Sequence, residues 1–141
     1  MKLLLPLLFS TLIPAQAIAF GGPQYGYNST GQLVDFTAIP YGAATPGTTV
    51  FYTSQNHGAF IVFLLEGASL TVTPMLFNAT LYVDDIVNIV PAVLTPSFAT
   101  WVADRAIPND PSLIGGVYFA QFAHLFSAHY GLSYGIQVTI Q

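Results

Sequence analysis

The side chains that could do chemistry in this chain are few, since 141 residues include three histidines and six acidic residues. The histidines are His57, His124 and His129. His124 and His129 are five residues apart, a spacing that does not place two ligands on one helical face. A zinc site needs three or four converging ligands. We therefore interpret the histidines as isolated polar positions and predict no metal site.

The remaining motifs with chemical meaning are short. Asp84-Asp85 could bind calcium through carboxylate oxygens, but no D-x-D-x-D-G loop surrounds the pair, which favours a charged turn. Asn28-Ser29-Thr30 and Asn78-Ala79-Thr80 match the N-x-S/T acceptor pattern, which matters only in a cell that glycosylates exported proteins. These matches predict surface turns and leave modification open.

Catalytic signatures are sparse as well. No G-x-S-x-G motif is present. Acid–base catalysis needs paired carboxylates, or a base beside a nucleophile, and few side chains here could supply either. The chain is therefore predicted not to be an enzyme and to need no cofactor, with a small secreted hydrolase as the third interpretation.

The aromatic residues carry the most suggestive pattern. Tyrosine and tryptophan rings can stack on sugars or form an association surface, and they can equally fill a core. The candidate ligand-binding residues are Trp101, Tyr130 and Tyr134.

Turn signals divide the chain into short strands without a long 3.6-residue period. This pattern predicts an all-β, antiparallel β-sandwich, jelly-roll-like or Ig-like. Ala59 to Leu65 is an apolar run fit for a strand buried on both faces, which Glu66-Gly67 interrupts. The other predicted strands are Leu33 to Ala38, Thr48 to Thr53, Ser69 to Thr73, Ala79 to Val83, Ile86 to Val90 and Ser97 to Ala103, with Asp84-Asp85 as a turn.

The last third of the chain, Ala106 to Gln141, gives the sharpest expectations. Asn109-Asp110-Pro111 is turn chemistry, and Gly115-Gly116 can supply a positive φ before a strand. Val117 to Leu125 could be a helix, but its aromatics favour a strand. A Gly/Ser/Tyr loop then precedes Ile136 to Gln141, whose alternation places Ile136, Val138 and Ile140 toward the core.

The first residues predict export. Lys2, the apolar stretch from Leu3 to Ile13 and the small residues at Ala15-Gln16-Ala17 and Ala17-Ile18-Ala19 are typical of a cleaved signal peptide, residues 1–19. One domain, residues 20–141, would remain, opening with an irregular segment, Phe20 to Gly31.

Charge and cysteine content narrow the partners further. Without Lys2 the mature chain has one strong base, Arg105, and six acids, a net charge of 1 − 6 = −5. Binding to nucleic acid or to an anionic membrane surface needs clusters of Lys and Arg, so neither is predicted. There is no cysteine, so the domain must rely on its core or on neighbours.

Three pieces of the chain carry a family resemblance: Gly31 to Ala38, Asn78 to Asp84, and the ending IPNDPSLIGGVYFAQF with GLSYGIQVTIQ. Together they resemble an uncharacterised secreted β domain of Planctomycetes and related bacteria. The match falls on Ile107, Pro108, Asn109, Pro111, Leu113, Gly115, Gln121, Gly131 to Ser133 and Val138 to Ile140. Tyr27 and Ala79 stand where many relatives carry cysteines, and Ser133-Tyr134 replaces the usual Ser-Asn. The resemblance implies the β fold and export, and no activity.

These observations predict an exported, non-enzymatic structural or interaction domain, secreted or at the cell surface. Low charge and the absence of lysine from the mature chain favour association with copies of itself or with an extracellular matrix. The alternative is a carbohydrate-binding module with a glycan on exposed Tyr and Trp rings. No membrane span is expected in the mature chain, because Asn88, Pro91 and Pro96 interrupt its most apolar stretch.

Overall fold

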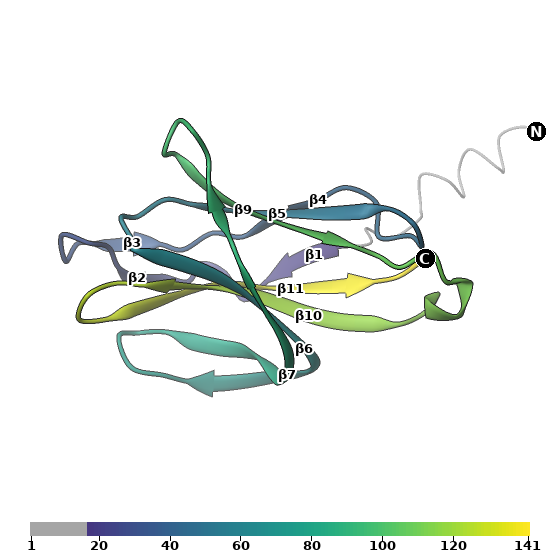
Figure 1. The fold of residues 1–141 in the computed structure, drawn as a ribbon. Helices are drawn as coiled ribbons and strands as arrows, with labels where there is room; N and C mark the ends of the chain where they lie inside the picture. Colours follow the sequence, from purple (N-terminus) through teal and green to yellow (C-terminus); the bar gives the residue numbers. More distant parts are fainter. Residues whose placement is uncertain (1–16) are drawn as a thin grey trace, which may run out of the picture.

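The computed structural model describes residues 17–141, which form antiparallel sheets packed against one another (Figure 1). The predicted antiparallel β-sandwich is confirmed. The strands are β1 (Ala17–Phe20), β2 (Tyr25–Tyr27), β3 (Leu33–Asp35), β4 (Ile39–Tyr41), β5 (Thr49–Gln55), β6 (Ile61–Pro74), β7 (Thr80–Pro91), β8 (Val93–Leu94), β9 (Thr100–Ala106), β10 (Val117–Leu125) and β11 (Tyr130–Thr139), with one 3-10 turn, η1 (Pro111–Leu113). In this part of the chain no helix has the length and apolar character needed to cross a membrane.

Two sheets face each other across the core. The larger sheet has the order β1-β11-β10-β6-β7, and the smaller sheet has the order β4-β5-β9-β8. A separate two-stranded sheet pairs β2 with β3. Alternate residues of the facing strands point inward, as period-two alternation requires. The resulting core contains Val50, Tyr52, Val62, Leu64, Trp101, Ala103, Ala120, Phe122, Ile136 and Val138.

The β6–β7 hairpin forms a third layer. Register shifts occur at Glu66/Gly67 and at Leu70/Thr73, and such bulges bend the strand that carries them. Beyond the first bend, the distal part of the hairpin runs below β10 and β11 in Figure 1, on the side away from the smaller sheet. A second cluster of buried residues lies between the hairpin and strands β10 and β11. It contains Ala79, Ala123 and Leu132, with Leu65, Leu81 and Tyr130 packed alongside.

A buried glutamine fastens this hairpin to the sheet. Gln121 on β10 is 0% exposed. Its Nε2 donates to the carbonyl oxygens of Thr80 and Ser133, both at 2.8 Å. Its Oε1 accepts from the backbone N–H of Tyr82 at 2.9 Å. The side chain of Gln121 therefore bonds the backbone of β7 at Thr80 and Tyr82, and it also bonds the Ser133 carbonyl on β11.

Several strand predictions are confirmed. Val117–Leu125 is a strand with the predicted bounds. Ile136, Val138 and Ile140 are buried while Gln137 is exposed, which confirms the predicted register. Gly115 has a φ of 88°, and Asp110 caps η1 by accepting from the Ser112 backbone N–H.

Other predictions are wrong for a common reason. Glu66-Gly67 and Asp84-Asp85 do not end strands. Glu66-Gly67 lies at a register shift inside β6, and Asp84-Asp85 lies inside β7, where Asp85 has a φ of 47°. The run from Ala59 to Leu65 is buried on one face at Val62 and Leu64, whereas Phe63 and Leu65 on the other face are only partly covered.

Boundary predictions failed at three further places. The Gly/Ser/Tyr loop is shorter than predicted, because β11 begins at Tyr130. Phe20 to Gly31 is not wholly irregular, since it contains β2 and the end of β1. The strand that carries Trp101 runs over Thr100–Ala106, later than predicted. The predicted signal peptide lies mostly outside the described residues, although Ala17 to Ala19 belong to β1.

Candidate functional site

A serine and a histidine meet inside the sandwich. Ser54 on β5 and His124 on β10 are 1% and 0% exposed, and Ser54 Oγ lies 2.8 Å from His124 Nε2. Ser54 Oγ also donates to the Thr37 carbonyl at 2.7 Å. Its single proton is used there, so His124 Nε2–H donates to Ser54 Oγ. A serine nucleophile needs a base that accepts its proton and a path to solvent. This pair offers neither and acts as a polar bridge between the sheets.

The other ring nitrogen of His124 has no partner. Nδ1 is buried and is the one side-chain polar atom of the described residues in that condition. Burial, with a contribution from nearby His57, lowers the pKa of His124 to about 3. The Phe36 ring lies edge-on to both imidazoles, with centroids 4.9 Å away in each case. His124 is therefore neutral in the folded protein at neutral pH.

The remaining polar motifs make separate contacts. His129 Nε2 lies 2.9 Å from the Tyr27 carbonyl and 3.1 Å from the Asn28 carbonyl, and its ring stacks on Phe126. In residues 17–141 no three His, Asp or Glu side chains gather as a metal site would require. Asp84 Oδ1 accepts from the Asp85 N–H, and Asp85 Oδ2 accepts from Ser69 Oγ at 2.5 Å. The two carboxylates thus brace the irregularity in β7.

The three predicted ligand-binding aromatics are spread over the fold. Trp101 on β9 is 7% exposed, lies in the core and donates its indole N–H to Asn56 Oδ1. The prediction that Trp101 belongs to an exposed stacking surface is wrong, because core residues cover its ring. Tyr130 packs under the hairpin, and its hydroxyl accepts from the Leu76 N–H at 3.1 Å. Tyr134 donates to Asp35 Oδ2 at 2.5 Å, and this bond raises the pKa of Tyr134 to about 12. Among the described residues no ring contact joins any two of the three.

A cleft of about 250 Å³ opens between the two sheets beside the β7 edge. Four polar side chains, Glu66, Asn88, Arg105 and Tyr118, line part of it. The rest of the wall is mainly apolar and comprises Gly67, Val87, Ala106, Ile107, Pro108, Leu113 and Ile140. A concave site with apolar walls and a few convergent polar groups is the usual form of a small-molecule site.

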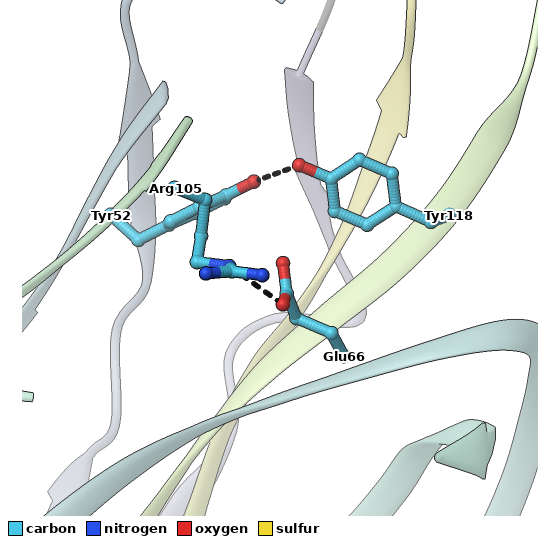
Figure 2. A network of polar contacts seen from close by, with 4 residues as sticks. All are labelled: Tyr52, Glu66, Arg105 and Tyr118. Carbon is cyan, nitrogen blue, oxygen red and sulfur yellow. Dashed lines mark hydrogen bonds and ion pairs between the residues drawn. The ribbon is translucent and has the colours of Figure 1, made fainter. Parts of the chain in front are cut away.

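Two polar pairs cross between the sheets at this cleft (Figure 2). Arg105 Nε on β9 donates to Glu66 Oε1 on β6 at 2.8 Å. The hydroxyls of Tyr52 on β5 and Tyr118 on β10 lie 2.7 Å apart. Each pair joins a residue of the smaller sheet to one of the larger sheet. Polar groups therefore link the two sheets where the core meets the cleft.

Burial sets the electrostatics of this network. The Glu66 side chain is 7% exposed and that of Arg105 is 33% exposed. Burial raises the pKa of Glu66, and the charge and hydrogen bond of Arg105 partly offset that rise. Burial also raises the pKa of both Tyr52 and Tyr118, so the hydroxyl pair stays protonated at neutral pH.

The sequence analysis did not predict Glu66 or Arg105 as site residues. Both could have been noticed, because Glu66 follows an apolar run and Arg105 is the only arginine. A charged residue beside buried strands usually needs a partner of opposite sign. The strand pairing could not be deduced from the sequence, so the partner could not be named.

Exposed apolar side chains gather on the β6–β7 hairpin. They are Leu70, Val72, Met75, Leu76, Phe77, Ile86, Val87 and Ile89. Soluble monomers rarely expose contiguous apolar patches beyond a few hundred Å². The hairpin is accordingly the second candidate site, one for association rather than for a small molecule.

No family model matches the chain, and no curated protein or solved structure matches it.

Proposed function

We propose that this chain is an exported, non-enzymatic interaction domain that associates with copies of itself through the free side of β7. The observation that carries the proposal is the character of that edge. β7 is the longest edge strand of the described residues, spanning Thr80–Pro91, and within residues 17–141 it pairs with no strand other than β6. Glutamine side chains bond its backbone at Thr80 and Tyr82, so the part that ends at Pro91 carries the proposal. Ile86, Val87 and Ile89 on it are 44%, 69% and 60% exposed. A long apolar edge with free backbone groups is a template for pairing with another strand.

Charge does not guard this edge. Lysine is the usual blocker of exposed strands, and the described residues contain none. Arg105, their only strong base, bonds to Glu66 between the sheets. If two copies pair antiparallel about Val87 and Asn88, Asp84 and Asp85 of one copy lie opposite Pro91 and Val90 of the other. Like charges then avoid direct opposition, and both copies use the same surface, as a two-fold dimer requires.

Export completes the proposal. The Lys2, Leu-rich and Ala-x-Ala order supports secretion or display at the cell surface. The resemblance to a secreted β domain points the same way. Outside the cell, the same edge could pair with a strand of a matrix protein. The oligomeric state of the purified chain distinguishes the two partners, because only pairing with a second copy makes the purified chain self-associate.

The test is a change at the edge with a matched control elsewhere. Ile89→Lys should convert the purified protein to a monomer, because a lysine on β7 opposes strand pairing. Leu33→Lys changes an equally exposed apolar residue on β3, away from the edge, and should leave association intact. Sedimentation velocity over a concentration series measures both. A wild-type chain that remains monomeric at the highest concentration, or equal loss in both variants, contradicts the proposal.

One observation favours a second candidate, glycan binding at a different place from the predicted one. Tyr41 and Phe51 are cross-strand neighbours on β4 and β5 with rings 17° from parallel, and they are 50% and 39% exposed. Exposed, nearly parallel rings can stack on sugars, although cross-strand aromatic pairs also stabilise sheets. Loss of glycan-array binding in Tyr41→Ala, with retention in Tyr25→Ala, would support this candidate.

A further inference from the structure

We propose that the inter-sheet cleft binds a small organic monocarboxylate, with its carboxylate on the terminal guanidinium nitrogens of Arg105 and its apolar body against Val87, Leu113 and Ile140. This inference does not rest on the proposed association. Val87 and Asn88 belong both to the cleft wall and to the β7 edge proposed for pairing, so the binding experiment is carried out on the Ile89→Lys chain as well as on the wild type.

The first argument is a surplus of hydrogen-bond donors. A guanidinium carries five N–H donors and no acceptor. Glu66 takes the one at Nε, and residues 17–141 supply no other hydrogen bond to this group. The Arg105 side chain is 33% exposed and lines the cleft, so its terminal nitrogens are accessible from that side. A ligand for this position must bring acceptor oxygens, and a carboxylate matches the planar fork in bidentate fashion.

The second argument is charge. Glu66 and Arg105 are the charged residues of the cleft wall, and they are already paired. One guanidinium whose charge is partly offset can accept a monoanion, whereas a phosphate dianion would repel the Glu66 carboxylate without a second cation to compensate. The site therefore favours a carboxylate over a phosphate group.

The third argument is the shape and chemistry of the remaining wall. Apart from the polar side chains named above, the cleft is lined mostly by aliphatic residues and proline. Its volume of about 250 Å³ lies just below the usual range for drug-sized ligands, which implies a short ligand. An aliphatic body of a few carbons would remove this apolar wall from water, adding a hydrophobic contribution to binding.

The experiment titrates the purified chain with hexanoate and with hexanamide, its neutral analogue of similar shape, and follows binding by NMR. Hexanoate should shift the amide signals of Gly67 and Leu113 and saturate, and hexanamide should bind at least about tenfold more weakly, because a charge-assisted hydrogen bond is worth that much. Equal affinity for the two probes, or no saturable shift with hexanoate, overturns the proposal.

Two variants test the roles of the ion pair in opposite directions. Glu66→Gln keeps an acceptor for Arg105 Nε but removes the repelling charge, so hexanoate should bind several-fold more tightly. Arg105→Lys keeps the positive charge for Glu66 but loses the planar fork, so affinity should fall about tenfold. Asp104→Asn removes an exposed charge next to Arg105 in the chain and serves as the control for net charge. If Asp104→Asn tightens binding as much as Glu66→Gln does, or Arg105→Lys binds hexanoate as wild type does, the assignment is wrong.

Discussion

Gln121 Nε2 donates to the Thr80 carbonyl at 2.8 Å, and this bond joins the central strand β10 to the start of the edge strand β7 across the outer face of the same sheet. The two residues are 41 positions apart in the chain. Because the same side chain also bonds Tyr82 and Ser133, Gln121 is a central attachment of the third layer to the sandwich. Gln24 Nε2 adds a second bond to the Thr80 carbonyl at 2.9 Å.

The first prediction concerns this attachment. Gln121→Leu keeps a similar volume but removes the partner of the Tyr82 N–H and of the Ser133 carbonyl, and each buried unsatisfied group costs about 1–3 kcal/mol. The Thr80 carbonyl keeps a bond from Gln24 Nε2 at 2.9 Å. We expect faster amide exchange across the distal part of the hairpin and a free energy of unfolding lower by about 2 kcal/mol or more. Hydrogen exchange with urea denaturation measures both. Gln137→Leu on β11, at an exposed site, is the control, and equal effects of the two changes would contradict the attachment.

The second prediction concerns the bend in β6. A Cβ on Gly67 would lie 2.2 Å from the Asp84 backbone oxygen and 2.6 Å from Val83 Cγ1. Neither neighbour is the end of a flexible side chain, so Gly67→Ala should push β7 away and lower the free energy of unfolding by about 1–3 kcal/mol. Ala68→Ser changes the exposed neighbour and should have little effect. Thermal unfolding compares them, and a wild-type melting temperature for Gly67→Ala would rule out the close approach.

The third prediction concerns acid stability. The pKa of His124 is lowered to about 3 in the folded state, whereas an unfolded histidine titrates near its ordinary value of 6.5. Between these values the unfolded chain binds more protons, so stability is full above pH 6.5 and falls as the pH drops toward 3, at up to about 1.4 kcal/mol per pH unit.

Urea unfolding at a series of pH values checks this third prediction. His124→Gln should flatten the slope below pH 6.5, although His57, whose pKa burial also lowers, still contributes. Gln137→Leu, which changes an exposed residue that does not titrate, is the control and should keep the wild-type slope. Parallel slopes in His124→Gln and wild type would show that His124 does not control acid stability.

The fourth prediction distinguishes the two cleavage positions of the predicted signal peptide. β1 pairs Ile18 with Gln137 and Ala19 with Ile136 on β11. Cleavage after Ala19 would remove most of this strand, while cleavage after Ala17 would keep Ile18 to Phe20. This pairing shifts the expectation from cleavage after Ala19, as the sequence alone indicated, to cleavage after Ala17, so secreted protein should begin at Ile18, as read by intact-mass spectrometry. A start at Phe20 would mean that β11 forms the edge of the larger sheet after export.

Strand positions and buried faces that depend on alternation and on turn residues could be predicted from the sequence. Strict alternation located the buried face of Ile136, Val138 and Ile140, and aromatics with a preceding glycine pair located β10. Such patterns depend on neighbours within a strand, so they are readable without the fold.

The sequence could not predict features that depend on pairing between distant segments. Glu66-Gly67 has the composition of a strand end, and only contact with β7 converts it into a bend within a strand. Trp101 was assigned to a surface because nothing local separates a core ring from an exposed one. The Glu66–Arg105 pair joins residues 39 positions apart, so its existence followed from the sheets and not from a motif.

The position of Arg105 on the paired strand β9 also bears on proteolysis. Trypsin-like proteases read a basic side chain in a specificity pocket, and residues 17–141 offer a single basic side chain of that kind, bonded to Glu66 between the sheets. Digestion after Arg105 therefore requires β9 to leave the smaller sheet. Resistance to this class of protease follows from the pairing of β9 between β5 and β8, and cleavage after Arg105 would report opening of the sandwich.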